Sequence, residues 1–391
     1  GSGVAEVIET HAKSIIKRTD GEMLEVAKIL DLRDFPDDKH ADLFTKDFND
    51  ILNDPEIKVV AETMGGVNPA FDFTSKLLKA GKSVVTSNKE LVAQKGLELL
   101  ETAKANGVNY LFEASVGGGI PIIRPINNCL TAERIVEVSG ILNGTTNYIL
   151  TKMEQEGMLF EEALGQAQAL GYAERNPEAD VEGYDACRKI AILTSLVAGK
   201  TVDFHKIHTE GITGIDPTDF AYAKKLDATI KLLAVSRETE DGYQISVAPY
   251  LLKKENALAG VNDVFNAVAV CGNTLGDTMF YGRGAGKLPT ASAVVADVVE
   301  CARHLQKTVG CLWEEGEAKV ADFDSQEGRF FVRVSKKARA DVEKVFGAVV
   351  PVVLDSASEE FAFVTESMQE AEFEKCREQI SGFVKKIRIK D

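Results

Sequence analysis

Strand-like and helix-like stretches alternate through the first third of the chain. Short apolar runs predict strands, and apolar residues at helical spacing predict helices between them. The expected strands are 25–32, 57–61, 82–86 and 110–113, and the expected helices are 4–8, 69–80 and 90–106. This alternation predicts a parallel, doubly wound sheet of the Rossmann-like α/β class.

A doubly wound sheet binds its ligands beyond the carboxyl ends of its strands. Three polar or glycine-containing breaks directly follow predicted strands: Gly65-Gly66, Ser87-Asn88-Lys89 and Glu113-Ala114-Ser115. Ordinary connecting turns explain these breaks equally well. Gly117-Gly118-Gly119 follows, and glycine lets a backbone approach a ligand closely. No Gly-Lys-Ser/Thr follows this loop, so it is not a P-loop.

After residue 122 the pattern changes and predicts a second sheet with helices on one face. Its expected strands are 135–142, 203–207 and 243–251, and its expected helices are 147–156, 160–170, 184–198 and 218–236. A second glycine loop, 280–290, precedes a helical run over 291–305. A glycine loop at a helix N-terminus suits an anion, although G-x-G-x-G alone is weak evidence.

The last part of the chain has the pattern of a small separate unit. Residues 306–326 read as an acidic linker. Predicted strands and helices then follow in the order strand 329–335, helix 338–347, strands 349–354 and 360–365, helix 369–381 and strand 383–389. This βαββαβ order predicts a ferredoxin-like fold.

An acid- and lysine-bearing stretch, residues 171–189, is the strongest candidate for chemistry. Asp185 and Lys189 are four residues apart and therefore share one face of the predicted helix 184–198. Glu174 lies upstream on a turn, from which it can fold back toward them. On pattern alone, a solvated helix start with an i,i+4 ion pair is the commoner explanation.

Composition narrows the classes of partner. The 391 residues carry a net charge of −16, which argues against nucleic acid and against an acidic membrane surface as partners. We see no apolar run near 20 residues and no signal peptide, so a cytoplasmic location is expected. The six cysteines form no C-x-x-C pair, and we expect most to be buried in a reduced compartment. His205 and His208 have no neighbouring ligands that would complete a zinc set.

Five motifs, in order along the chain, resemble those of one enzyme family. They are Thr86-Ser87-Asn88-Lys89, 113–121 (Glu-Ala-Ser-Val-Gly-Gly-Gly-Ile-Pro), 143–147 (Asn-Gly-Thr-Thr-Asn), 171–189 and 282–286 (Gly-Arg-Gly-Ala-Gly). The chain resembles homoserine dehydrogenase of the bacterial type over roughly residues 1–310. Its tail resembles the ACT regulatory domain that is often fused to this enzyme.

The resemblance implies an NAD(P)-dependent interconversion of L-homoserine and L-aspartate 4-semialdehyde, a step of threonine, methionine and isoleucine biosynthesis. By resemblance, the catalytic residues are Lys189, Lys89 and Asp185. The substrate-binding residues by resemblance are Glu174, Asp185, Gly144, Thr145 and Tyr172. A lysine ammonium suits this reaction, because it stabilises charge on the aldehyde oxygen and can donate a proton.

The resemblance also implies a cofactor site and a cation site. The cofactor residues are Gly1, Gly3, Val4, Arg33, Gly65, Gly66, Lys89 and Gly286. Both an acid, Asp31, and Arg33 follow the second strand; an acid favours NAD and an arginine favours NADP, and we lean slightly toward NADP. A sodium ion is expected at Glu113, Val116, Gly118 and Ile120, held by main-chain carbonyls and one carboxylate.

The expected domains are a nucleotide-binding domain, 1–115 completed by 280–310, a substrate-binding and dimerisation domain, 116–279, a linker, 311–327, and an ACT-like domain, 328–391. Two features depart from the family pattern. The first strand and the start of its glycine loop are absent, either because the sequence is a fragment or because residues 1–3 are a cloning remnant. The tail has 335–339 (Ser-Lys-Lys-Ala-Arg) where many ACT domains have an Asp-x-Pro-Gly turn. A homodimer or homotetramer and a threonine effector are expected by analogy.

Two alternatives stay open from the residues. Aspartate-semialdehyde dehydrogenase shares the Rossmann core but needs a nucleophilic cysteine, for which Cys129 is the candidate. No suitable histidine motif accompanies Cys129. A non-catalytic amino-acid-binding regulator is the second alternative, and the presence of Lys89 and Lys189 argues against it.

Overall fold

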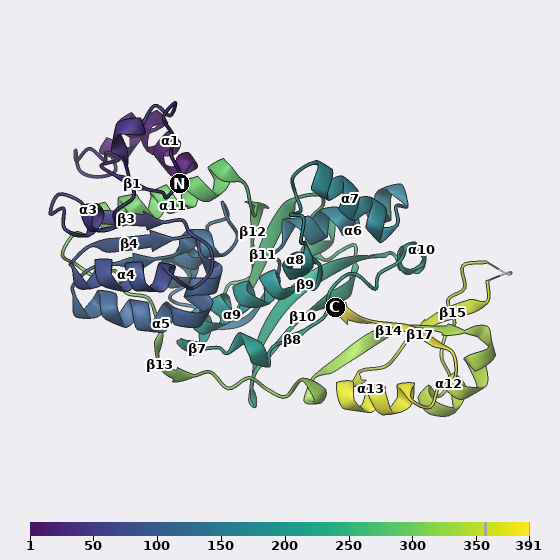
Figure 1. Cartoon of the computed structure of the whole chain (residues 1–391). Coiled ribbons are helices and arrows are strands. Elements are labelled where there is room, and N and C mark those ends of the chain that lie inside the picture. Colours follow the sequence, from purple (N-terminus) through teal and green to yellow (C-terminus); the bar gives the residue numbers. More distant parts are fainter. Residues whose placement is uncertain (356–357, 391) are drawn as a thin grey trace. The chain divides into compact units, whose positions relative to one another are not determined.

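The computed structural model describes residues 1–355 and 358–390 and divides the chain into two compact units. Unit 1 comprises Gly1–Ala132, Ser195–Thr201 and Arg283–Gly316. Unit 2 comprises Glu133–Thr194, Val202–Gly282 and Glu317–Asp391. Both units are therefore built from separate stretches of sequence, and Figure 1 follows these stretches by colour.

Unit 1 contains the predicted parallel sheet with helices on both faces. Its strands form two parallel groups, β1-β2 and β3-β4-β5. In Figure 1, α1 and α11 lie on one side of β3 and β4, and α4 and α5 lie on the other. The strands are β1 (Ile29–Leu30), β2 (Phe44–Thr45), β3 (Val59–Glu62), β4 (Ser83–Thr86) and β5 (Tyr110–Leu111). The helices are α1 (Ser2–Thr10), α2 (Ala12–Ile16), α3 (Asn49–Leu52), α4 (Ala70–Lys79), α5 (Lys89–Ala105) and α11 (Lys287–Arg303).

Strand β4 is the centre of the unit 1 core. All four of its residues are buried, as expected for a parallel strand that helices cover on both faces. Val85 packs in one cluster with Ala114 and with Val294 and Val298 of α11. Residues 195–201 add β7 (Lys200–Thr201), which pairs with β13 (Glu314–Glu317).

Unit 2 is built on one ten-stranded sheet. Its main path runs β12-β11-β6-β9-β10-β17-β14-β15, with β8 paired to β10 and β16 paired to β14. The strands of its first part are β6 (Ile135–Ile141), β8 (His208–Thr209), β9 (Ala228–Thr239), β10 (Gly242–Lys253), β11 (Phe265–Gly272) and β12 (Gly276–Arg283). The helices there are α6 (Gly144–Glu156), α7 (Phe160–Ala169), α8 (Glu178–Val181), α9 (Tyr184–Ala198) and α10 (Pro217–Lys225).

The carboxyl-terminal region continues this sheet. It contains β14 (Glu327–Ser335), α12 (Arg339–Phe346), β15 (Glu360–Val364), β16 (Met368–Gln369), α13 (Glu370–Arg377) and β17 (Phe383–Lys390). β17 pairs antiparallel with β14 and parallel with β10, where Tyr250 is opposite Arg388. Buried aromatic residues, including Phe330, Phe363 and Phe373, form the core of this region.

Four secondary-structure predictions were wrong. The strand expected over 25–32 is only two residues long and half-buried, and 203–207 forms a 3₁₀ turn before β8. Residues 349–354 form only an isolated bridge, between Val352 and Ala362. The helix expected over 218–236 ends at Lys225, and β9 follows. β9 lies between β6 and β10, and the residues of its first part are all buried. It therefore lacks the apolar–polar alternation of a half-exposed strand and resembles a buried helix in sequence.

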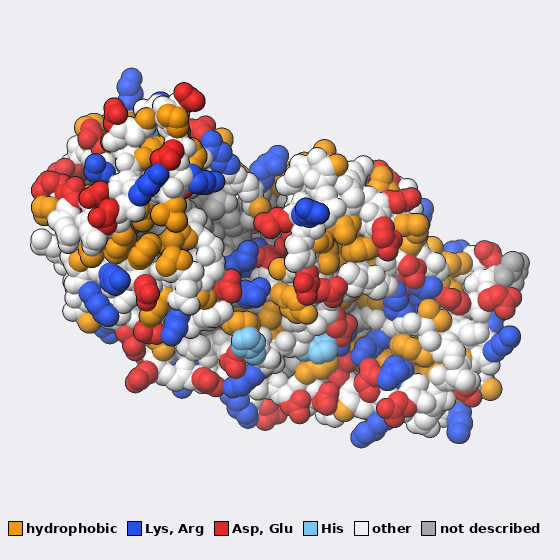
Figure 2. Space-filling model, viewed as in Figure 1, with side chains coloured by type: hydrophobic (Ala, Val, Ile, Leu, Met, Phe, Trp, Pro, Cys, Tyr) orange, Lys and Arg blue, Asp and Glu red, His pale blue; other side chains and the backbone are white. Residues whose placement is uncertain are grey.

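The structure also bears on the expectations about cysteine burial, membrane helices and surface charge. The expectation that most cysteines are buried was wrong, because only Cys187 and Cys301 are buried, although all six are free thiols. Within the described residues, no helix combines the length and apolar character that crossing a membrane requires. Figure 2 shows acidic and basic side chains intermixed over the visible face, with no extended basic patch.

Candidate active site and cofactor site

A buried ion pair in unit 2 lies where the sequence predicted chemistry. Lys189 Nζ donates hydrogen bonds to Asp185 Oδ2 at 2.6 Å and to the main-chain oxygen of Leu142 at 2.7 Å. Lys189 is 8% exposed and Asp185 is 3% exposed. The solvated-helix explanation is therefore wrong for these two residues. A buried ammonium with two fixed acceptors is held in one position rather than free in solvent.

Asn143 joins this pair to the start of α6. Its side-chain amide donates to Asp180 Oδ1 at 2.7 Å and to Asp185 Oδ2 at 2.9 Å. Its side-chain oxygen accepts the Thr146 N–H at 2.9 Å and so caps α6. The sequence analysis included Asn143 and Asp180 only as members of the motifs 143–147 and 171–189. The available signal was the cap position of Asn143, directly before the Gly-Thr-Thr run.

The predicted substrate residues lie around the same helix start. Gly144 begins α6, and a β-carbon there would lie 2.8 Å from the main-chain oxygen of Val264, so only glycine fits. Thr145 Oγ1 donates to the main-chain oxygen of Tyr172 at 2.6 Å. Tyr172 is 44% exposed, and Glu174, two residues later, is also exposed. The structure thus joins Thr145 to Tyr172 and leaves the Glu174 carboxylate at the surface.

In unit 1, the carboxyl ends of β3 and β4 meet, as predicted. Asn88 Nδ2 donates to the main-chain oxygen of Gly66 at 2.7 Å, and this links the Gly65-Gly66 turn to the start of α5. Lys89 is the first residue of α5. Glu62, which the sequence did not single out, is buried and accepts from Thr86 Oγ1 at 2.6 Å. Burial raises the pKa of Glu62, and hydrogen bonds oppose that rise.

Two helix N-termini lie together in unit 1. Gly1 caps α1 and Gly286 caps α11, with φ of +116° at Gly286. A β-carbon on Gly3 would lie 3.0 Å from Lys287. Glycine therefore lets α1 pack closely on α11, and Val4 is half-buried beside the α11 core residues. Paired N-termini present amides and positive dipole ends to an anion, as the pyrophosphate of a dinucleotide requires.

Arg33 follows β1 and is bound to the acid that precedes it. Its Nε and Nη2 donate to the two carboxylate oxygens of Asp31 at 3.0 and 2.8 Å. These bonds lower the pKa of Asp31 to about 2. A cavity of about 250 Å³ is lined by Asp31, Arg33, Phe35, Thr45 and Lys46 among others. The Asp31 carboxylate is thus bound to Arg33, and the side chains of Arg33 and Lys46 remain exposed in this cavity.

The Glu113 carboxylate of the expected cation site binds three main-chain N–H groups. Glu113 accepts main-chain N–H groups from Ile122 at 2.6 Å, Ile123 at 2.9 Å and Arg124 at 2.7 Å. Its carboxylate therefore caps the next turn, and a sodium contact of that carboxylate stays a prediction. The main-chain oxygens of Glu113, Val116, Gly118 and Ile120 are the remaining candidates. The described residues contain no cluster of three His, Cys, Asp or Glu side chains that suits a metal.

The loop that carries these oxygens is tightly packed. Gly118 has φ of +55°, and a β-carbon there would lie 2.3 Å from the main-chain oxygen of Gly284. Gly119 N–H donates to the main-chain oxygen of Arg283 at 3.1 Å. The two glycine loops recognised in the sequence are therefore bonded to each other within unit 1.

Comparisons with known proteins give the family of the chain. Residues 121–299 match the homoserine dehydrogenase family model, and residues 1–113 match its NAD-binding domain. A homoserine dehydrogenase of Pseudomonas aeruginosa is 45% identical over 306 residues, 78% of this chain and 70% of its own. One of Bacillus subtilis is 39% identical over 347 residues, 86% of this chain and 79% of its own.

Solved structures give the same result. A homoserine dehydrogenase of Thiobacillus denitrificans superposes with a TM-score of 0.91 at 33% identity, covering 100% of this chain and 96% of its own. A hyperthermophilic archaeal homoserine dehydrogenase in complex with NADPH has a TM-score of 0.65 at 27% identity, covering 77% and 93%. Fold and site thus define an NAD(P)-dependent oxidoreductase. The chain belongs to the homoserine dehydrogenase family.

Proposed function

We propose that Lys189 is the proton donor and acceptor in the interconversion of L-homoserine and L-aspartate 4-semialdehyde. When bound, the nicotinamide cofactor supplies or accepts the hydride. In the reductive direction, negative charge grows on the aldehyde oxygen. The Lys189 ammonium stabilises that charge and gives the proton that completes the hydroxyl group.

The hydrogen bonds of the Lys189 ammonium are the observation that carries this role. An ammonium has three N–H donors. Two point at Asp185 and at the Leu142 oxygen, which leaves the third for a substrate oxygen. Asp185, itself held by Asn143, positions the ammonium and offsets its burial.

The residues near the start of α6 bind the amino-acid part of the substrate in this proposal. The α-carboxylate suits the first-turn amides of α6, at Gly144 and Thr145, because a helix N-terminus favours an anion. The α-ammonium suits the exposed Glu174 carboxylate, which follows by two residues Tyr172, whose main-chain oxygen accepts a hydrogen bond from Thr145.

Substitution of Lys189 tests the proposal. Lys189→Ala is expected to lower kcat about 10²- to 10⁴-fold in both directions, the usual range for loss of a general acid–base group. Lys254→Ala, at a lysine whose side chain is 59% exposed, is the matched control and should keep full activity. Both variants are first checked for cooperative unfolding. A folded Lys189→Ala enzyme with kcat within a few-fold of the parent would overturn the assignment.

We infer NADP as the preferred cofactor, with NAD as the second. Gly1, Gly3, Val4, Gly65, Gly66 and Gly286 would hold its pyrophosphate, and Lys89 would lie at its nicotinamide end and assist charge stabilisation. Arg33 supports NADP, because it neutralises Asp31 and faces a cavity that also contains Lys46. NADPH is present in the related archaeal structure.

We propose that the loop oxygens of Glu113, Val116, Gly118 and Ile120 hold a sodium ion. Main-chain carbonyls are suitable ligands for a hard monovalent cation, and this loop is fixed by its contact with Gly284. The test is direct: exchange of sodium for a bulky organic cation should lower activity reversibly, and activity independent of the monovalent cation would count against the site.

We infer that residues 328–391 form an ACT-like domain that binds threonine as an effector, beyond a linker at 311–327. The order β14-α12-β15-β16-α13-β17 supports a ferredoxin-like arrangement. Its third strand, β16, has only two residues. Where many ACT domains have an Asp-x-Pro-Gly turn, Ser335 here caps a 3₁₀ turn. Threonine is expected to inhibit homoserine oxidation by the full chain, and initial rates unchanged by added threonine would count against the effector.

We propose a homodimer or homotetramer that assembles through the 116–279 domain. β12 is at the end of the unit 2 sheet and alternates half-buried and exposed residues. Met279 and Tyr281 on its exposed face are 43% and 53% exposed, which suits an interface. Light scattering of the parent and of Tyr281→Glu tests the assembly.

We infer a reducing, cytoplasmic location, with which the free thiols are consistent.

A further inference from the structure

A large cavity lies within unit 1, apart from the residues assigned to the cofactor. It has a volume of about 890 Å³ and is formed between α1–α2 and α11. Its apolar floor contains Ile15 and Val295, which are buried, and the half-buried Val299. A volume in this range suits a small organic ligand rather than a lone ion.

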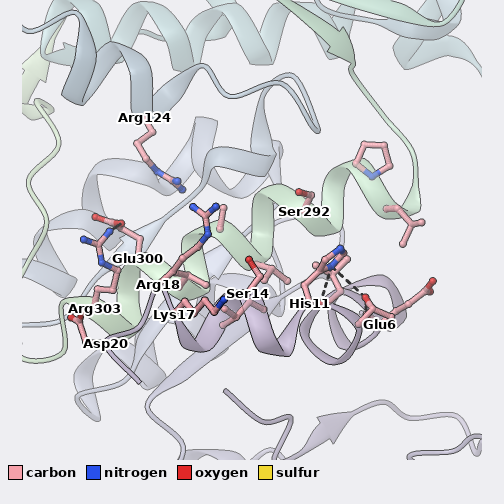
Figure 3. Close-up of a pocket in the computed structure, with 18 residues that line it drawn as sticks. Glu6, His11, Ser14, Lys17, Arg18, Asp20, Arg124, Ser292, Glu300 and Arg303 are labelled. Atoms are coloured by element: carbon pink, nitrogen blue, oxygen red, sulfur yellow. Dashed lines mark hydrogen bonds and ion pairs between the residues drawn. The ribbon is translucent and has the colours of Figure 1, made fainter. Parts of the chain in front are cut away.

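Three arginines gather at one end of this cavity. Arg18, Arg124 and Arg303 all line it, each from a different segment of unit 1. Figure 3 shows the guanidinium groups of Arg18 and Arg124 pointing toward one another, with Arg303 beside Glu300 nearby. Like charges that face each other repel unless an anion lies between them.

Three carboxylates lie near the arginines: Asp297 and Glu300, which are engaged by basic groups, and the exposed Asp20. Asp297 is bound to the Arg124 guanidinium, and its other oxygen accepts the Glu113 N–H at 2.8 Å. Glu300 lies 3.5 Å from Arg303 and 3.3 Å from His304. Burial raises the pKa of Asp297, and the Arg124 guanidinium opposes that rise. Lys17 also lines the cavity, so four cations face three acids, Asp20, Asp297 and Glu300, and one positive charge is left over at this end.

We propose that this cavity binds a small organic anion. The oxyanion, a phosphate or a carboxylate, lies between Arg18 and Arg124 with Arg303 beside it, and an apolar body lies against Val295 and Val299. Arginine is suited to this role because its planar group binds carboxylate and phosphate oxygens in pairs. The inference concerns binding only and does not depend on the catalytic roles proposed above.

Calorimetric titration of the full chain with inorganic phosphate, phenyl phosphate and benzoate tests the site. Phenyl phosphate should bind about tenfold tighter than phosphate, because partial burial of its ring on the valine floor equals one or two buried methylenes. Comparison of phenyl phosphate with benzoate identifies the preferred oxyanion. Binding of an aromatic anion supports the site where substitution of the cavity arginines weakens it.

Matched variants separate this cavity from the cofactor site. Arg18→Gln and Arg303→Gln should each weaken phenyl phosphate binding about tenfold, the loss of one charge-assisted contact. Arg33→Gln should leave that binding unchanged. Both cavity arginines are exposed, so the variants are expected to fold. The proposal is overturned if none of the three anions binds, or if Arg18→Gln and Arg303→Gln bind phenyl phosphate as the parent does.

Discussion

Lys189 shows how a single residue acquires a role from its neighbours. A buried ammonium is costly unless hydrogen-bonded to an anion, and Asp185 supplies that anion four residues earlier on the same helix. Leu142, from the end of β6, fixes the second donor. The side chain therefore has a defined position before substrate arrives, which is a precondition for efficient proton transfer.

Asp185→Asn should separate positioning from proton transfer. The amide keeps the size of the carboxylate but removes its charge, so the Lys189 ammonium loses its fixed anionic partner. We expect kcat to fall about 10²-fold, within the usual range for a disturbed acid–base group, with a smaller change in KM for homoserine. Steady-state kinetics with Asp180→Asn as control checks this, and equal effects of the two substitutions would contradict the positioning role.

Glu174→Ala should change substrate affinity rather than turnover. Glu174 is exposed, so its attraction to a substrate ammonium is screened by solvent. We expect KM for homoserine to rise about tenfold with kcat nearly unchanged, as for loss of one charge-assisted contact. Glu178→Ala, at an exposed acid four residues later, is the control. An unchanged KM would show that Glu174 is only a surface acid.

Arg33→Ala should change cofactor preference. The arginine occupies both oxygens of Asp31, so its removal frees an acid that suits the ribose hydroxyls of NAD. We expect kcat/KM for NADP to fall at least about tenfold, the loss of one phosphate contact, while that for NAD stays constant or rises. Parallel assays with both cofactors measure the ratio. A fall of equal size for both cofactors would argue against phosphate recognition.

The sequence predicts some site residues and misses others for a physical reason. Asp185 and Lys189 could be predicted as a pair because helical spacing brings i and i+4 together. Asn143 and Asp180 could not, because their bond joins residues 37 apart in the chain. Glu62 was missed for the same reason: its partner Thr86 is on the next strand.

At the scale of elements, burial explains which predictions fail. Helices α1, α4, α5, α6, α7 and α9 were predicted to within a few residues, whereas the short helices α2, α3 and α8 were not predicted. β9 was predicted as part of a helix, because a strand buried on both faces loses its alternation. Asp227, with φ of +52°, marks the break between α10 and β9.

Arg333 of β14 connects elements that are far apart in the sequence. It is 3% exposed and donates to Asp219 at 2.5 Å and to Asp216 at 2.9 Å, both at the start of α10. It also donates to Glu360 of β15 at 2.9 Å. Removing this arginine would take away one of the two cations paired with the buried Asp219 carboxylate, the other being Lys385 at 2.9 Å.

Arg333→Ala is therefore expected to destabilise unit 2 strongly. Loss of one partner of a buried ion pair costs about 3–5 kcal/mol. Arg339→Ala, at an arginine whose side chain is 53% exposed, should cost less than about 1 kcal/mol. Urea unfolding of both variants measures the free energies. Equal stability of the two would show that the Arg333 cluster contributes nothing beyond a surface pair.

At the scale of the molecule, the fold class could be predicted but the continuity of unit 2 could not. Local pattern was enough for the parallel sheet of unit 1 and for most strands and helices after residue 327. The pairing of β10 with β17 leaves no local signal, because it joins Tyr250 to Arg388 across a long stretch of sequence. Only the folded chain shows that the carboxyl-terminal strands belong to the same sheet.

That junction gives unit 2 a defined acid sensitivity. Burial alone would raise the pKa of Glu210, but hydrogen bonds from His208 at 2.6 Å and Arg388 at 2.8 Å outweigh burial and lower the pKa to about 2. A carboxyl whose pKa is lower in the folded state stabilises the fold above its unfolded pKa, about 4.5 here. This contribution is lost as pH falls from about 4.5 to about 2.

Glu210→Gln should reveal this contribution. The Glu210 side chain is 37% exposed, so we discount the pKa shift for solvent screening and expect a loss of about 1 kcal/mol at pH 7. The difference from the parent should shrink as pH falls through 4 toward 2, because the parent's carboxyl then takes up a proton. Urea unfolding across this pH range, with the exposed Glu255→Gln as control, measures it. A difference that stays constant with pH would mean that Glu210 acts through packing rather than through its charge.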